Sequence, residues 1–413
     1  MNTANADVLV IGGGAAGLMA AGTAASRGKS VILIEKNRIL GKKLLITGKG
    51  RCNITNACED VETLLENVTI NHTFLYSAFY GFTNKDTIKF FNDLGVETKV
   101  ERGNRVFPVS DKSQSVVNAL SSYVKKNGVR IIHDKVTEIL TDDNNSVCGV
   151  KSEKNGRISA NSVILATGGA SYTATGSTGD GYKWASDLGH KITHITPSLV
   201  PVVVEEKWAY DLMGISLKNI EITVVNEKNK KIYTDFGELM FAHFGLTGPV
   251  ILSASAHMRP MAAGRYKIFL DLKPALDEKT LDARLLRDFQ KYANRDFVNS
   301  LGELIPQGLI DTIIYLSGID PRKKVNSITK EERKKLVSII KGIEFNVTDF
   351  SPIEQAIITS GGVSVKDIDA STMESKRVKN LYFAGEIIDV DAYTGGFNLQ
   401  IAFSTGRLAG QSC

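Results

Sequence analysis

The chain has 413 residues, too many for a single hydrophobic core, so two or three structural units are expected. Hydrophobic residues make up 43% and charged residues 23%, as in ordinary globular proteins, and no apolar run is long enough to predict a membrane span. The net charge of +5 is mildly basic and does not by itself indicate a partner.

The first residues, "MNTANADVLVIGGG", contain neither a basic leader nor a small-residue cleavage site. Their apolar run is therefore expected to be a buried strand and not a signal peptide. The four cysteines, at positions 52, 58, 148 and 413, form no C-x-x-C pair. We therefore expect no metal site, no disulfide framework and a cytoplasmic location. Cys52 is interpreted as a buried spectator in preference to a reactive thiol.

Residues 7–36 predict one βαβ unit. The apolar run 8–11 is typical of a strand covered on both faces, and 31–34 is a second such run. Between them lies an alanine-rich helix, opened by a turn with the spacing G-x-G-x-x-G. The second strand ends in Glu35. Strand, glycine turn, helix, strand and acid together predict a dinucleotide-binding fold.

The residues of this unit have separate physical roles. Gly12 permits the tight turn, Gly14 lets a pyrophosphate approach the backbone, and Gly17 lets helix and strand pack closely. The N–H groups at the helix N-terminus favour phosphate. Glu35 would accept hydrogen bonds from both ribose hydroxyls and would repel a 2′-phosphate, so the expected dinucleotide is FAD or NAD.

A glycine-rich loop follows at residues 41–56, "GKKLLITGKGRCNITN". Backbone donors alternate there with lysines and an arginine, a pattern that predicts a phosphate-binding loop; the alternative is a basic surface loop. The loop ends in polar, uncharged residues, among them Asn53 and Thr55. These side chains suit the edge of a flavin ring or a substrate.

Residues 162–181, "SVILATGGASYTATGSTGDG", predict a buried strand that ends in a sharp turn at Thr167 and Gly168. In open α/β sheets, ligands lie at the carboxyl ends of such strands. The Gly, Ser and Thr residues that follow predict a long loop with little side-chain bulk, suited to lie against a flat ligand.

The last segment, "FAGEIIDVDAYTGGFNLQIAFSTG", predicts a strand ended by Gly385 and Glu386 and a helix that begins near Asn398. Glu386 would accept hydrogen bonds from a ribityl chain. The helix N-terminus would stabilise the negative charge of a reduced flavin. A nicotinamide cofactor would not need this second set of residues, so FAD is favoured over NAD.

Residues 196–351 contain no nucleotide motif. Their first part alternates in β fashion, and about 276–342 reads as amphipathic helices. We expect an inserted substrate or cap domain, β-rich and barrel-like, with a nested helical module. The insert would divide the FAD-binding domain into 1–195 and 352–413.

Two residues have two open interpretations each. His243, in "LMFAHFGLTGPVIL", is either a proton donor or substrate ligand over the flavin or a strand-end histidine. Tyr393 either shields the flavin or donates a proton, or is a packed loop aromatic.

The motifs "IGGGAAGLMAA", "GKKLLITGKGRCNITN", "ATGGASY", "FAHFGLTGPVIL" and "AGEIIDVDAYTGGFNLQIAFSTG" resemble, in this order, those of the BaiN-like (YhiN-like) family of NAD(P)/FAD-dependent oxidoreductases. The resemblance covers nearly the whole chain. It implies an α/β fold with a Rossmann-like FAD-binding domain of the glutathione-reductase type, split by an insert that covers the flavin. It also implies oxidoreductase activities that range from aminoketone oxidation to enone reduction.

We therefore expect an FAD-dependent enzyme that transfers hydride between flavin N5 and a small organic substrate, with NAD(P)H or oxygen as the other partner. No second G-x-G-x-x-G is present, so NAD(P)H would bind only transiently. One alternative is a flavin-dependent RNA-modifying enzyme that uses the basic stretch 321–335, although nucleic acid is not the expected partner. Another is a non-catalytic, redox-sensing flavoprotein.

The candidate catalytic residues are Asn53, Thr55, His243 and Tyr393. The residues expected to bind FAD, without a covalent bond, are Gly12, Gly14, Ala15, Ala16, Gly17, Glu35, Lys36, Gly41, Lys43, Thr47, Gly48, Gly50, Arg51, Val136, Thr167, Gly168, Gly385, Glu386, Gly396, Asn398 and Leu399.

Overall fold

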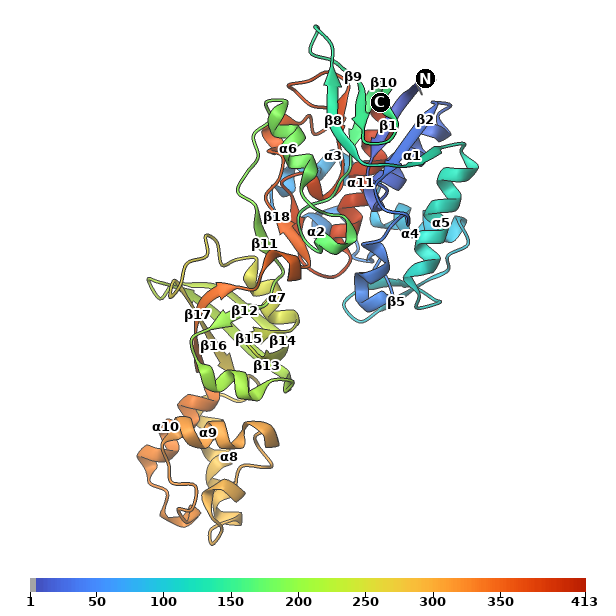
Figure 1. Cartoon of the computed structure of the whole chain (residues 1–413). Coiled ribbons are helices and arrows are strands. Elements are labelled where there is room, and N and C mark those ends of the chain that lie inside the picture. Colours follow the sequence, from blue (N-terminus) through green and yellow to red (C-terminus); the bar gives the residue numbers. More distant parts are fainter. Residues whose placement is uncertain (1–4) are drawn as a thin grey trace. The chain divides into compact units, whose positions relative to one another are not determined.

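The computed structural model describes residues 5–413, which divide into two units (Figure 1). Unit 1 runs to Ser198 and resumes at Ile353–Cys413, and unit 2 is Leu199–Pro352. Among the described residues, no helix combines the length and the apolar character that a membrane crossing requires.

Unit 1 is built on a seven-stranded sheet with the order β7-β2-β1-β10-β9-β8, in which β19 also pairs with β10. The strands are β1 (Asn5–Ile11), β2 (Val31–Glu35), β7 (Arg130–His133), β8 (Val136–Thr141), β9 (Val147–Ser152), β10 (Gly156–Leu165) and β19 (Leu381–Phe383). Strands β7, β2, β1, β10 and β19 run parallel, whereas β8 and β9 form an antiparallel extension. The central parallel strands are apolar and buried along most of their length, because helices and loops cover both faces.

Helix α1 (Ala15–Ser26) packs between the sheet and two other helices, α5 (Ser113–Lys126) and α11 (Phe397–Ser412) (Figure 1). Its alanines leave room for a close approach by α11, where Gly406 and Gly410 lie against the carbonyl oxygens of Ala16 and Ala20. A side chain at either glycine would clash with that backbone. The last helix of the chain is thus fixed on the first.

The rest of unit 1 consists of short elements around this core. They include the sheets β3-β6-β5, β4-β20 and β11-β18. Their bounds, with those of the remaining helices, are β3 (Thr55–Asn56), α2 (Val61–Glu66), β4 (Val68–Ile70), α3 (Tyr76–Gly81), α4 (Asn84–Asp93), β5 (Thr98–Glu101), β6 (Arg105–Pro108), α6 (Asp180–Asp187), β11 (Thr196–Ser198), β18 (Ile358–Ser360) and β20 (Asp391–Ala392).

Unit 2 contains a closed six-stranded barrel with the order β12-β15-β14-β13-β16-β17. The strands are β12 (Val202–Val204), β13 (Ser216–Asn226), β14 (Lys231–Ala242), β15 (Gly245–Thr247), β16 (Tyr266–Asp271) and β17 (Ile343–Phe350), and α7 (Pro249–Ser255) packs on β14. Buried and less buried side chains alternate along β16, as the pleat of a barrel strand requires.

Between β16 and β17 the chain forms the helices α8 (Glu278–Lys291), α9 (Ile310–Ser317) and α10 (Lys330–Lys341). Each is amphipathic and buries an apolar face, with α10 in contact with both other helices. A capping box between Thr329 and Glu332 fixes the start of α10. The fold is thus α/β with an inserted barrel and a helical region inside that insert.

Candidate active site

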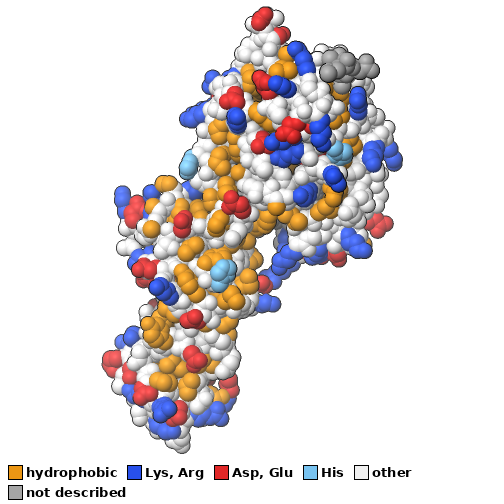
Figure 2. Space-filling view, in the orientation of Figure 1, with side chains coloured by type: hydrophobic (Ala, Val, Ile, Leu, Met, Phe, Trp, Pro, Cys, Tyr) orange, Lys and Arg blue, Asp and Glu red, His pale blue; other side chains and the backbone are white. Residues whose placement is uncertain are grey.

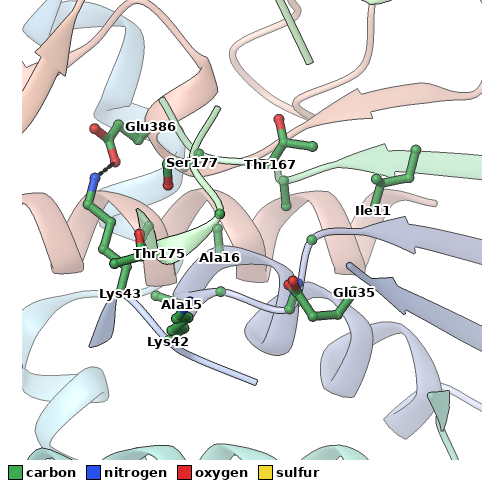
Figure 3. Close-up of a pocket in the computed structure, with 18 of the residues that line it drawn as sticks. Ile11, Ala15, Ala16, Glu35, Lys42, Lys43, Thr167, Thr175, Ser177 and Glu386 are labelled. Atoms are coloured by element: carbon green, nitrogen blue, oxygen red, sulfur yellow. Dashed lines mark hydrogen bonds and ion pairs between the residues drawn. The ribbon is translucent and has the colours of Figure 1, made fainter. Parts of the chain in front are cut away.

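A cavity in unit 1 lies at the carboxyl ends of the parallel strands. It is lined by residues that directly follow β1, β2, β10 and β19, and by the first turn of α11. Parallel strands bring such residues to one edge of a sheet, which explains why segments from both ends of the chain meet there. Figure 3 shows part of this lining, with Ile11, Glu35, Thr167 and Glu386 among the labelled residues.

The turn after β1 can be built only from small residues. Gly12 has φ +103°, and a Cβ there would clash with the carbonyl of Ala166. A Cβ on Gly17 would clash with the carbonyl of Gly12. At Gly14, by contrast, no atom lies within 4 Å of the point that a Cβ would occupy. Gly14 also lines the cavity, so its backbone is open to a ligand.

Glu35, at the end of β2, is 8% exposed and also lines the cavity (Figure 3). One carboxylate oxygen, Oε2, accepts a hydrogen bond of 2.7 Å from the Gly13 N–H. The other, Oε1, accepts from the backbone N–H of Asn37 at 2.7 Å and from its side-chain amide at 2.8 Å. These bonds fix the carboxylate at the rim of the glycine turn.

Residues 171–180, here called the clasp loop, are tied to the segment that follows β2 by a row of polar side chains. Lys36 Nζ donates to Thr178 Oγ1 at 2.6 Å and pairs with Asp180 at 2.8 Å. The side-chain amide of Asn37 donates to the carbonyl of residue 175 at 3.1 Å, and Lys42 Nζ to that of residue 174 at 2.7 Å. Because both segments line the cavity, the clasp loop closes one side of it.

A second polar cluster lies in the cavity wall. Lys43 Nζ pairs with Glu386 Oε2 at 2.7 Å and donates to Ser171 Oγ at 2.8 Å (Figure 3). Glu386 Oε1 accepts from the backbone N–H of Thr359 at 2.9 Å and from Ser171 Oγ at 3.1 Å. Glu386 is thus a fixed carboxylate whose charge Lys43 neutralises.

The first turn of α11 forms another part of the wall, through Asn398 and Leu399. Gly396, with φ +102°, precedes the helix and lies against the backbone of Thr55, where a Cβ would clash. Asn398 exchanges hydrogen bonds with Ala392, accepting from its N–H at 2.9 Å and donating to its carbonyl at 2.7 Å. The helix start is therefore held in one place, with the positive end of its dipole at the cavity.

These residues fit FAD. The cavity extends from Glu35, suited to the adenosine ribose, past the open backbone of Gly14 to the first turn of α11. Thr167 lines it as well, and its hydroxyl is buried against Gly181 without a hydrogen-bond partner in the chain.

Fifteen of the residues expected to bind FAD line this cavity: Gly12, Gly14, Ala15, Ala16, Glu35, Lys36, Lys43, Thr47, Val136, Thr167, Gly168, Gly385, Glu386, Asn398 and Leu399. The other six, Gly17, Gly41, Gly48, Gly50, Arg51 and Gly396, are not among its lining residues. Arg51 instead pairs with Glu101 and Asp111 and stacks on the ring of Phe107 at 4.1 Å. Its hydrogen bond lowers the pKa of Glu101.

The candidate catalytic residues do not line the cavity. Asn53 has a buried side-chain oxygen without a partner, and Thr55, fully buried, donates to Gln400. Tyr393 is half-buried, and its backbone N–H donates to the carbonyl of Asn67. His243 lies in unit 2, just beyond β14, and is exposed. Cys52 is buried, which raises the pKa of its thiol to about 12 and agrees with a spectator role.

Several lining residues are not among those expected to bind FAD, including Asn37, Asp180 and Trp184, whereas Lys42 belongs to the loop 41–56 whose lysines were expected to bind phosphate. Asn37 flanks a residue that was predicted, so its proximity in sequence was an available signal. Trp184 lies on α6, three residues after the segment 162–181, and nothing in the sequence indicated that its side chain lines the cavity.

The chain matches the family model described as "HI0933-like protein Rossmann domain" over residues 6–412. It is 30% identical to the 3-dehydro-bile acid delta(4,6)-reductase of Clostridium scindens, over 98% of both chains. It is also 30% identical to the ribosomal RNA dihydrouridine synthase of Haemophilus influenzae, over 96% of both chains. It is 27% identical to the ribosomal RNA dihydrouridine synthase of Escherichia coli, over 98% of this chain and 97% of that protein.

Among solved structures, the fold is similar to the 3-ketosteroid delta1-dehydrogenase of Sterolibacterium denitrificans, with a TM-score of 0.53, 14% identity and 99% coverage of both chains. It is similar also to the E. coli quinol fumarate reductase FrdA, with a TM-score of 0.52 and 20% identity. The match covers 100% of this chain and 70% of FrdA. The chain belongs to the HI0933-like Rossmann-domain family and is an FAD-dependent oxidoreductase.

Proposed function

We propose that this enzyme reduces a carbon–carbon double bond conjugated to a carbonyl group. The observation that carries this proposal is the chemistry shared by its relatives. A 3-dehydro-bile acid delta(4,6)-reductase and a dihydrouridine synthase are named for the reduction of C=C bonds conjugated to a carbonyl. The substrate would be a small organic enone, and bound FAD, once reduced by NAD(P)H, would supply hydride from flavin N5.

In this proposal, the chain's own residues bind FAD and orient it. Glu35 and the Gly14 backbone hold the adenosine and pyrophosphate, and Glu386, paired with Lys43, faces the ribityl chain. The first turn of α11 faces the flavin ring. The segments 1–195 and 352–413 are the FAD-binding domain in this proposal, and the insert 196–351 is its substrate or cap domain.

Reduction of an enone also requires a proton at the carbon next to the carbonyl. The chain offers Tyr393 and His243 as candidate donors and Asn53 as a candidate polar contact, whereas the Thr55 hydroxyl is bonded to Gln400. For Tyr393, a Tyr393→Phe variant that keeps flavin reduction by the donor but loses enone turnover would support the donor role.

The experiment uses the purified yellow holoprotein under anaerobic conditions. NADH or NADPH is added and flavin bleaching is followed at visible wavelengths; a steroid 4-en-3-one is then added, with the matching saturated 3-ketone as control. Bleaching by the nicotinamide and return of the yellow colour with the enone alone support the proposal. A reduced flavin that neither compound reoxidises contradicts it for small enones.

The uracil ring of RNA is a second candidate, because two relatives are named ribosomal RNA dihydrouridine synthases. In the basic stretch, Lys323, Lys324 and Arg333 are paired with Glu332, Asp296 and Asp282. Figure 2 shows acidic and basic side chains interspersed over this helical region, a pattern that does not favour phosphate binding. Reoxidation of the reduced flavin by ribosomal RNA, with formation of dihydrouridine, would establish this candidate over a small enone.

A further inference from the structure

A buried hydrogen-bond network joins three segments of unit 1 behind the cavity wall. Thr55 Oγ1 donates to Gln400 Oε1 at 2.6 Å. The amide nitrogen of Gln400 donates to the carbonyl of Phe82 at 3.0 Å and to Ser404 Oγ at 2.9 Å. Ser404 Oγ donates to the same Phe82 carbonyl at 2.7 Å. Thr55, Gln400 and Ser404 are each 0% exposed.

This network requires one position of α11. Every polar atom of the Gln400 side chain is used, and an unpaired amide would be costly in this apolar surrounding. A shift of the helix along its axis would break the bonds to Thr55 and Phe82 together. An apolar side chain of the same size would fill the space but would tolerate such a shift.

The part of α11 that this network holds in place is its first turn, which lines the cavity. Asn398, Leu399 and Ile401 are lining residues, whereas Gln400, between them in sequence, points to Thr55 and Phe82. Gly396, directly before the helix, lies against the Thr55 backbone so closely that a Cβ would clash. Thr55 therefore contacts the start of α11 through both its backbone and its side chain.

We propose that Gln400, held by Thr55, is a positioning residue that aims the N-terminal N–H groups of α11 at the flavin ring. The first N–H groups of a helix have no acceptor within the helix and carry partial positive charge. Held in place, they stabilise a negatively charged reduced flavin and raise its reduction potential. The inference rests on FAD as the cofactor and not on the identity of the substrate.

The test is the midpoint potential of the flavin in purified holoprotein, measured by dye equilibration at fixed pH. Thr55→Val keeps the shape of the side chain and removes the hydroxyl, and Gln400→Met keeps its length and removes the amide. Both variants are expected to have a more negative potential than the parent. Thr55→Ser restores a hydroxyl and is expected to restore the parent potential.

Thr87→Val is the matched control. Thr87, on α4, is also 0% exposed, and its hydroxyl donates to the carbonyl of Thr83, the N-cap residue of the same helix, at 3.1 Å. This variant is expected to lower the melting temperature but to leave the potential unchanged. The proposal is overturned if Thr55→Val and Gln400→Met lower the melting temperature in the same way and keep the parent potential.

Loss of FAD from a folded Thr55→Val protein, with recovery in Thr55→Ser, would also support the positioning role. None of these measurements uses a substrate, so failure of the enone-reductase proposal leaves this test intact.

Discussion

Lys43 and Glu386 lie 343 positions apart in the sequence and form an ion pair of 2.7 Å in the wall of the cavity. The Lys43 side chain is 24% exposed and that of Glu386 15%, so both charges have lost much of their water. Removal of one partner leaves the other charge partly desolvated and unpaired, which is worse than removal of both.

We therefore predict that Lys43→Met destabilises the apoprotein by about 1–3 kcal/mol. The double variant Lys43→Met/Glu386→Gln should recover part of that loss. Urea unfolding of the parent, the two single variants and the double variant gives the coupling free energy. If the two single losses simply add, the pair contributes nothing to stability.

The Glu35 carboxylate is expected to contribute to FAD affinity through a charge-assisted hydrogen bond. Glu35→Gln should weaken FAD binding by roughly 1.5–3 kcal/mol, because this charged acceptor is lost. Quenching of FAD fluorescence on titration into apoprotein measures the change. Glu344→Gln, which alters an exposed carboxylate paired with Lys267 in the barrel of unit 2, is the matched control and should bind FAD like the parent. Unchanged affinity in Glu35→Gln would mean that the adenosine ribose is held elsewhere.

The clasp loop is expected to slow the release of FAD. Lys36→Met removes the bonds to Thr178 and Asp180, which together contribute on the order of 1 kcal/mol because both are partly exposed. The FAD dissociation rate should then rise by about fivefold, as followed by trapping of released FAD with an excess of another apoflavoprotein. Lys89→Met breaks an exposed ion pair with Asp93 on α4 and should leave the rate unchanged. Equal rates in parent and Lys36→Met would show that the clasp loop opens independently of this contact.

The sequence predicted the fold well, because the FAD-binding elements are encoded locally. A glycine turn between two apolar runs is sufficient to predict β1, α1 and β2. The residues that follow β10 and β19 were predicted in the same way, because each set follows a short apolar run and includes glycine. The pairing of distant side chains was not predictable in this way. Arg51 was expected to bind a phosphate, but it forms ion pairs with Glu101 and Asp111, which lie on and after a separate hairpin.

Thr55 illustrates the same limit. Its sequence neighbourhood, a polar end to a glycine-rich loop, indicated a residue that faces the ligand. In the structure its hydroxyl turns to Gln400, 345 positions later in the chain. Which of two faces a short strand presents depends on the helix that packs against it, and that helix comes from the other end of the sequence.

His190 is expected to make the stability of unit 1 depend on pH. The imidazole is 3% exposed, its Nδ1 lies 3.0 Å from the carbonyl of Ala185, and its Nε2 lies 2.7 Å from Ser375 Oγ. Burial lowers its pKa below the ordinary value of 6.5; the charged groups that act on it are Asp367, which opposes the shift, and Arg377, which adds to it. The unfolded chain therefore binds a proton at a higher pH than the folded chain does.

The direction of the pH dependence follows from this difference between the folded and the unfolded chain. The stabilisation is fully present above pH 6.5 and is lost as the pH falls from there towards the folded pKa, with a slope approaching about 1.4 kcal/mol per pH unit for one proton. Asp367 stays ionised in this range: burial acts to raise its pKa, but the hydrogen bonds from Arg377 and from the Lys191 N–H, together with nearby positive charge, outweigh burial and hold that pKa below the ordinary value. Urea unfolding at pH 7.5, 6.5 and 5.5 should show this loss in the parent and a flatter dependence in His190→Gln. Identical pH profiles would mean that the imidazole is protonated equally in the folded and unfolded states, and that another group controls the loss of stability in acid.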